Sequence, residues 1–361
     1  MIIDNSENSM FEKSPNSLRA CIDWLSFTLH PDKGSYPKKI INFLGFNVDD
    51  FLRCGKGASG YRSMYRLNGD NVRILFDGKK DMGIHVDISG SAIATVLSAR
   101  LKKNTLVTPF GGQAVEYHNF ESSLLLDLLE EISEIATFTR VDFAIDDMGC
   151  NYYSCDEVVR LIENNQLVSK FKTYNNLAPC LLGSGEKRGH TVYLGSRQSE
   201  IMLRIYDKKL EFKDKYNADC PYNWVRWELE LKKNRANEAI RLLLKTRSLT
   251  AVTTGILSQY MRFIIYDNPV KSRCSNEPTW DKFLGDAEKM SLYVPDNPKT
   301  LDDTKKWIDK CVGASLCAVI EADGGSLDFI YNNLPKWRIR RIKNRDLTER
   351  LERSLKLQKQ K

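Results

Sequence analysis

The sequence predicts an α+β protein, with a mainly antiparallel sheet, helices on one face, an open polar face, and a helical C-terminal part. Strand-like stretches before about residue 233 alternate apolar and polar side chains, as a sheet with one covered face requires. Helical patterns separate these strands and dominate from about residue 234 onward. The 361 residues leave room for two domains.

The pattern divides the chain into four expected parts. Residues 1–18 are polar and expected to be disordered, 19–245 form the strand-rich domain, 246–336 a helical domain, and 337–361 a basic tail. Strands are expected at 19–29, 71–76, 83–89, 139–147 and 224–232, with a hairpin between 190–194 and 201–209. Helices are expected at 91–103, 122–136, 154–167, 234–246, 250–266, 279–290 and 301–319, and a mobile loop at 171–189.

The net charge of +7 is concentrated at the C-terminus. Residues 337–361 hold ten Lys or Arg and three Asp or Glu, so this segment carries the whole excess. Such a segment is either a solvated helical tail or a surface for the phosphate backbone of nucleic acid. The nine cysteines are scattered without a Cys-x-x-Cys pair, and no apolar run could span a membrane. A cytoplasmic protein with reduced thiols and no membrane partner is therefore expected.

The stretch 201–209 places a tyrosine between two cations. With period 2, Arg204, Tyr206 and Lys208 share one face of a strand. A phenol with a pKa near ~10 attacks well only when its phenolate is favoured, and cations do this. The pattern suits a nucleophile whose target is a phosphate, although exposed tyrosines between basic residues are also common on ordinary strands.

Acidic side chains share faces on the neighbouring strands. Asp142 pairs with Asp146, and Glu228 pairs with Glu230, each two residues apart. His85 and Asp87 have the same spacing on an earlier strand. Such carboxylates can converge on a divalent cation, or they can form a solvated sheet face. Other chemistries lack support, because the sequence has only four histidines and no phosphate-binding Gly-x-x-x-x-Gly-Lys loop.

Four motifs occur in a fixed order along the chain: 139–146, 193–197, 204–209 and 225–232. As a set they resemble the replication initiation factor family (Rep_trans type), which includes initiators of rolling-circle plasmids and relaxases of conjugative elements. The resemblance covers roughly residues 19–245. It implies a DNA replication initiation protein or relaxase whose nicking-joining catalytic domain is this segment.

The resemblance also implies a mechanism. Tyr206 attacks a phosphodiester at an origin, forming a 5′-phosphotyrosyl intermediate that starts rolling-circle replication or conjugative transfer. Mg²⁺ or Mn²⁺ would be held by Asp142 and by Glu228 or Glu230, with Asp146, Asp87 and His85 as weaker candidates.

Basic residues complete the expected site. Arg204 and Lys208 assist Tyr206 in catalysis, and Arg197, Lys209 and Arg226 contact DNA. Tyr193 is the alternative nucleophile. Expected partners are double- and single-stranded origin DNA, a host helicase and a second copy of the chain. The competing hypotheses are a non-catalytic, sequence-specific DNA-binding regulator on the same fold, and a structural sheet protein with a basic tail.

Overall fold

The computed structural model describes residues 18–30, 36–69, 71–104, 117–216, 220–285, 290–292 and 301–343, with 347, 348, 351, 352, 354 and 355. The chain forms two compact units, Met1–Tyr293 and Val294–Lys361. The predicted disorder of residues 1–18 lies outside the described residues, apart from Leu18, which begins the first strand.

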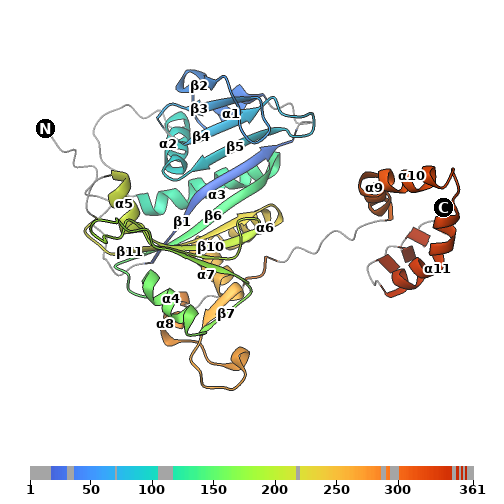
Figure 1. Ribbon diagram of the computed structural model, residues 1–361. Helices are drawn as coiled ribbons and strands as arrows, with labels where there is room; N and C mark the ends of the chain where they lie inside the picture. The colour runs from blue at the N-terminus through green and yellow to red at the C-terminus, as the bar shows by residue number, and fades with distance from the viewer. Residues whose placement is uncertain are drawn as a thin grey trace. The chain divides into compact units, whose positions relative to one another are not determined.

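The first unit is built on a sheet of ten strands (Figure 1). Their order is β2-β3-β4-β5-β1-β6-β11-β10-β9-β8, and every pairing is antiparallel. The strands are β1 (Leu18–Leu29), β2 (Phe51–Cys54), β3 (Ser63–Leu67), β4 (Val72–Phe76), β5 (Ile84–Ser89), β6 (Ala136–Met148), β8 (Tyr174–Leu177), β9 (Thr191–Leu194), β10 (Ile201–Asp207) and β11 (Trp224–Lys232). A separate pair joins β7 (Leu167–Ser169) to β12 (Met261–Phe263).

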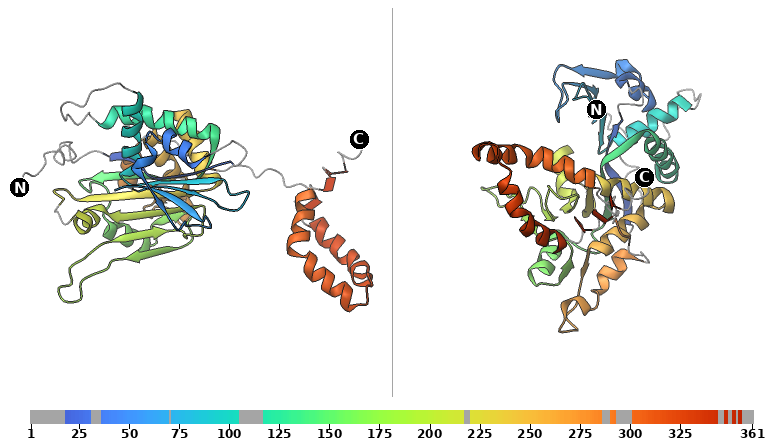
Figure 2. Two further views of the ribbon diagram at one scale, coloured as in Figure 1. Left: turned by 90° about the horizontal axis from the view of Figure 1, so that it is seen from above. Right: turned by 90° about the vertical axis from the view of Figure 1, so that its right-hand side faces the viewer.

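Helices cover one face of this sheet. Figure 2 shows α2, α3 and the α6–α7 pair on the same side of the strands. The helices of the unit are α1 (Pro37–Phe43), α2 (Ala92–Asn104), α3 (Tyr117–Ile135), α4 (Cys155–Glu163), α5 (Lys208–Tyr216), α6 (Asn234–Thr246), α7 (Leu249–Tyr260) and α8 (Pro278–Leu284). The predicted α+β class with an antiparallel sheet is therefore confirmed.

Alternation along the central strands explains which face is covered. On β6, Val141, Phe143 and Ile145 are fully buried in one hydrophobic cluster with residues of the helices. The strand-forming period of two sends the intervening Asp142 and Asp146 to the other face. Burial of these apolar side chains is the main stabilisation of the unit, at roughly 1.5–3 kcal/mol for each large side chain.

Residues 249–285 pack with the sheet rather than forming a separate helical domain. Trp227 of β11 lies 5.9 Å from Trp280 and 4.9 Å from Phe283 between ring centroids, and both partners belong to α8. These rings exclude water together, so α8 is part of the first unit. The division after Tyr293 therefore falls later than the boundary at 245/246 that the sequence favoured.

Two other elements differ from expectation near the site. Strand β10 ends at Asp207, because the Asp207 side chain accepts a hydrogen bond from the backbone N–H of Leu210 at 2.9 Å and caps α5. Lys208 therefore begins a helix instead of extending the strand. The expected mobile loop 171–189 contains the edge strand β8 and a bridge between Cys180 and Lys187. The helix expected at 250–266 ends at Tyr260 and is followed by β12, and the helix expected at 301–319 is divided into two helices. The other predicted strands and helices are present with shifted ends.

The second unit is helical, with α9 (Leu301–Cys311), α10 (Gly313–Ala322) and α11 (Asp328–Lys343). Part of the predicted basic tail lies in α11, and the residues after Lys343 are mostly outside the described part. Nowhere in the described part of the chain is a helix long and apolar enough to cross a membrane.

Candidate active site

The uncovered face of the sheet gathers charged side chains in cross-strand rows. Register places Arg226 opposite Tyr206, and Glu228 opposite Arg204. On the other side of β11, Asp146 faces Arg226 and Asp142 faces Glu230. The structure thus brings together Tyr206, Arg204 and the predicted acidic residues of β6 and β11.

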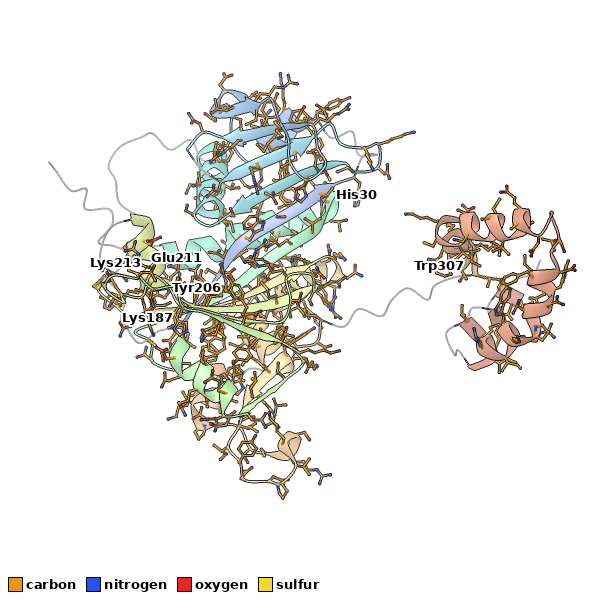
Figure 3. All side chains as sticks on the ribbon, in the orientation of Figure 1. His30, Lys187, Tyr206, Glu211, Lys213 and Trp307 are labelled. Carbon is orange, nitrogen blue, oxygen red and sulfur yellow. The ribbon has the colours of Figure 1, made fainter. Side chains whose placement is uncertain are left out.

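Tyr206 lies at the C-terminal end of β10, beside Glu211 of α5 (Figure 3). Its hydroxyl donates to Glu228 Oε2 at 3.3 Å, and Lys208 Nζ donates to the same hydroxyl at 3.4 Å. The guanidinium carbon of Arg204 lies 4.4 Å from the centroid of the ring. Lys208 therefore reaches the phenol from the first turn of α5, although it is not on the strand as expected.

The polar face is buried rather than solvated at this point. Tyr206 is 4% exposed and Glu228 is 3% exposed. Burial raises the pKa of the Tyr206 phenol above its ordinary value, with the charge of Arg226 opposing this effect. Burial also raises the pKa of Glu228, against the effect of Arg204. The phenol is therefore protonated at rest, and its neighbour is a carboxylate with increased affinity for a proton.

Arg204 fixes that carboxylate in place. Its Nη2 donates to both oxygens of Glu228, at 2.8 and 2.7 Å. Its Nε is buried and has no hydrogen-bond partner among the described residues. Because the pair is charge-assisted and largely desolvated, Arg204 holds Glu228 against the phenol.

Arg226 lies inside the face and binds two carboxylates. Its Nε and Nη2 donate to Asp146 at 2.6 and 2.8 Å, and its Nη1 donates to Asp23. A direct contact between Arg226 and DNA was expected, but the buried guanidinium is held by these acids. Asp23 was missed by sequence reasoning, because a register shift between Ile22 and Trp24 interrupts the alternation there.

Asp142 and Glu230 share a second arginine. Arg140 donates to Asp142 through Nε at 2.8 Å and Nη2 at 2.5 Å, and Nη2 also lies 2.8 Å from Glu230 Oε2. Lys232 Nζ lies 2.5 Å from the other oxygen of Glu230. Burial raises the pKa of Asp142 to about 7, although Arg140 opposes the shift. Arg140 was not predicted, but its position two residues before Asp142 was a usable signal.

The expected metal ligands are therefore arranged as ion pairs. Asp142 and Glu230 are bound by Arg140, and Glu228 by Arg204. Across the described ranges, no group of three or more His, Cys, Asp or Glu side chains is placed to hold a metal ion. The residues as arranged do not fit a shared divalent cation site.

His85 and Asp87 form a separate cluster on β5. Asp87 accepts from Ser26 Oγ at 2.5 Å and Arg73 Nη2 at 3.0 Å, and lies 3.1 Å from His85 Nε2. Burial opposes ionisation, but hydrogen bonds from His85 and Ser26 hold the pKa of Asp87 below its ordinary value. Strands β1 and β6 separate this cluster from β11, so it is not beside Tyr206.

The remaining predicted residues lie around the edge of the site. Arg197, in the turn between β9 and β10, has its guanidinium carbon 5.7 Å from the centroid of the Tyr193 ring. Tyr193 faces Arg204 across the strand pair. Lys209 Nζ contacts Asn223 Oδ1 at 3.2 Å and belongs to α5.

The structure is thus an α+β protein whose sheet carries a buried tyrosine–carboxylate pair among arginines. Comparison with known proteins identifies the class further. Residues 136–333 match the family model described as replication initiation factor. NicK of Bacillus subtilis (strain 168), a candidate DNA relaxase, is 33% identical over 272 residues, covering 74% of this chain and 71% of that protein.

The fold is also found among solved structures. The rolling circle replication initiator protein from Geobacillus stearothermophilus superimposes with a TM-score of 0.61 at 24% identity, covering 76% of this chain and 100% of that one. This chain belongs to the replication initiation factor family, and the resemblance carried by its four motifs is confirmed.

Proposed function

We propose that this protein is a DNA replication initiation protein or relaxase that nicks one strand at an origin. The observation that carries the proposal is the contact between the Tyr206 hydroxyl and Glu228, on the sheet of a family whose named members are an initiator and a candidate relaxase. The relatives support nicking of origin DNA, and the contact between Tyr206 and Glu228 supports a tyrosine mechanism.

In the proposed reaction Tyr206 is the nucleophile and Glu228 is the general base. The phenol oxygen attacks the phosphorus while its proton passes to Glu228 Oε2, which already lies 3.3 Å away. The bond from phosphorus to the 3′ oxygen breaks, leaving a 5′-phosphotyrosyl link, and the released 3′ oxygen takes up a proton from solvent and becomes a hydroxyl. Religation is the reverse step and needs no ATP, because the phosphotyrosyl bond replaces the broken one.

The cations have separate tasks in this scheme. Lys208 Nζ, 3.4 Å from the phenol oxygen, stabilises negative charge as the proton leaves. Arg204 orients the base through its two hydrogen bonds to Glu228. Arg226 acts indirectly. Its hydrogen bonds to Asp146 and Asp23 hold β11 against β6 and β1 beside Tyr206.

A requirement for Mg²⁺ or Mn²⁺ stays a prediction. The ion-paired carboxylates do not present a metal cluster, so the scheme routes no step through a metal. Binding of the host helicase, dimerisation and a cytoplasmic location are likewise predictions. Origin DNA, in double- and single-stranded form, is the proposed partner.

The test uses a supercoiled plasmid that carries the DNA flanking the coding sequence, incubated with the full chain and Mg²⁺ or Mn²⁺, or with EDTA. With Mg²⁺ or Mn²⁺ we expect relaxed product and a covalent protein–DNA adduct, and the predicted metal requirement means that EDTA should prevent both. Tyr206→Phe should abolish the adduct and retain DNA binding, whereas Tyr193→Phe should retain both. An adduct that survives Tyr206→Phe and disappears with Tyr193→Phe would assign the nucleophile to Tyr193.

One observation favours a second candidate, a non-catalytic DNA-binding regulator. Tyr206 is 4% exposed, and burial raises the pKa of its phenol, so the resting side chain is shielded from a substrate. In that case the plasmid would be bound with either metal but never relaxed or linked to the protein.

A further inference from the structure

A cavity of 320 Å³ opens on the polar face next to the Tyr206–Glu228 pair. It lies between β6, β11 and β10 and the turn that joins β9 to β10. The lining is almost entirely polar: Arg140, Tyr193, Arg197, Met202, Arg204, Glu228, Glu230 and Lys232. Neither the proposed attack on phosphorus nor the proton transfer uses most of this lining.

The charge of the lining favours an anion. Four cations and two carboxylates line the cavity, and Asp142 behind the lining is bound by Arg140, so the excess is one positive charge. Arg140 and Lys232 are tied to Glu230, and Arg204 is tied to Glu228. Within the described ranges, the Arg197 guanidinium has no carboxylate partner and instead lies over the Tyr193 ring. A phosphodiester would supply the missing charge.

Tyr193 gives the cavity an aromatic wall. The ring is half-buried and lies below the Arg197 guanidinium, with 5.7 Å between the guanidinium carbon and the ring centroid. An aromatic ring beside an arginine plane is the arrangement on which bases of single-stranded nucleic acid stack.

The cavity lies two residues along the β9–β10 pair from the proposed nucleophile. Tyr193 faces Arg204, whereas Tyr206 faces Thr191, so the two tyrosines are offset by two residues along paired strands. This offset is about 7 Å along the strands. This distance is close to the length of one nucleotide in an extended single strand of DNA. One DNA strand can therefore contact Tyr193 and Tyr206 at the same time.

We propose that this cavity is a subsite for one nucleotide of single-stranded DNA, adjacent to the scissile phosphate. The base stacks on the Tyr193 ring, and the adjoining phosphate contacts the Arg197 guanidinium beside that ring. The inference rests on the proposed function, and it gives Tyr193 a role in binding instead of attack. A free nucleotide has the same base and phosphate as a nucleotide within DNA. A competition experiment distinguishes these two ligands.

The experiment measures binding without cleavage, in the full chain with Tyr206→Phe. The probe is a fluorescein-labelled oligothymidylate of about 12 nucleotides, followed by anisotropy at fixed low ionic strength. Tyr193→Leu should weaken binding by about 5- to 150-fold, the range for loss of one stacked base. Tyr193→Phe, which keeps the ring, should bind as the parent does. Arg197→Ala should weaken binding and lower the salt slope by about 1.

The matched control is Tyr174→Leu on the neighbouring strand β8. Tyr174 pairs with Leu194, which belongs to the opposite face of the sheet from Tyr193. It is also exposed, so the substitution tests loss of a surface tyrosine outside the cavity. Its binding should match the parent within the error of the measurement. Thermal unfolding of every variant verifies that each retains the fold.

A second probe isolates the base from the phosphate. An abasic oligomer of the same length should bind the parent more weakly than oligothymidylate, and Tyr193→Leu should remove most of that preference. Equal weakening by Tyr193→Leu and Tyr193→Phe, or an unchanged preference in Tyr193→Leu, would overturn the stacking subsite. Displacement of the probe by thymidine monophosphate at similar concentration would assign the cavity to free nucleotides.

The proposed function is tested by other readouts. Covalent adduct formation depends on Tyr206, which the binding experiment removes. A protein that nicks but shows no Tyr193-dependent binding disproves the subsite alone, and a protein that binds through Tyr193 without ever forming an adduct disproves the nicking activity alone.

Discussion

The hydroxyl of Tyr206 and the carboxylate of Glu228 lie 3.3 Å apart, on adjacent strands of one sheet. Burial raises the pKa of both groups, so the phenol holds its proton at rest and the carboxylate is a better acceptor than an exposed glutamate. Arg204 limits how far Glu228 can move. The site is thus arranged for transfer of one proton as substrate arrives.

Glu228→Gln should reduce adduct formation by about 10²- to 10⁴-fold, the usual contribution of a general base. Since burial raises the pKa of Glu228, the acidic limb of the rate–pH profile should lie above the ordinary glutamate range, with activity rising as Glu228 loses its proton. Single-turnover nicking across pH measures both effects. Glu230→Gln is the comparison, because Glu230 lies on the same face but is bound by Arg140 and Lys232. This variant should retain the acidic limb of the rate–pH profile.

Lys208→Met should slow formation of the adduct on the order of 10-fold, because the donor 3.4 Å from the phenol oxygen is lost. The neighbouring Lys209→Met removes the same charge from α5, but Lys209 contacts Asn223 rather than Tyr206. Rates measured under single-turnover conditions should therefore differ between the two variants. Equal rates would show that Lys208 acts only through net charge.

Arg204→Met should lower the free energy of unfolding by about 2–4 kcal/mol, since Glu228 is left buried without its cation. This loss is smaller than the roughly 3–5 kcal/mol for breaking a fully buried ion pair, because the Arg204 side chain is 31% exposed. Adding Glu228→Gln should recover most of the loss in urea unfolding. On the surface of α6, Arg241→Met breaks the pair with Glu238 and should change stability by less than about 0.5 kcal/mol.

Asp142 should make the fold less stable as pH rises from about 4 to about 7. The pKa of its carboxyl is about 7 in the folded chain against an ordinary value of 3.8, so between these values the folded state holds a proton that the unfolded state has lost. Asp142→Asn should remove this part of the pH dependence of the unfolding free energy. Any change in stability that is the same at every pH does not affect this slope. Urea unfolding at several pH values tests it, and an exposed control, Asp156→Asn, should leave the slope unchanged.

The basic end of the chain should add DNA affinity without sequence preference. Replacing the arginines of α11 with glutamine should lower the slope of log affinity against log salt concentration by about 2 to 3 if they contact phosphates; these are Arg338, Arg340 and Arg341. The same number of lysines on α9 of the same unit provides the control: Lys305, Lys306 and Lys310. Equal slopes in both variants would remove the special role of α11.

Much of the fold follows from local pattern. Period-2 alternation in β6 and β11 identifies their apolar faces, and the Ser154–Glu157 capping box begins α4 as the sequence indicates. The short strand β8 and the strand pair β7–β12 were missed, since strands of three or four residues owe their existence to their partners. Lys208 was assigned to a strand because the cap made by Asp207 depends on a bond formed only in the folded chain.

The amino-acid pattern alone predicts the α+β class, the strand face that Tyr206 shares with Arg204, and the acids on the neighbouring strands. Spacing along each strand decides these points. Which acid meets the phenol depends on the packing of the strands, because cross-strand register places Glu228 beside Arg204 while Arg140 binds Asp142 and Glu230. Register and desolvation arise from the packing of distant segments, and a period of two contains no information about either.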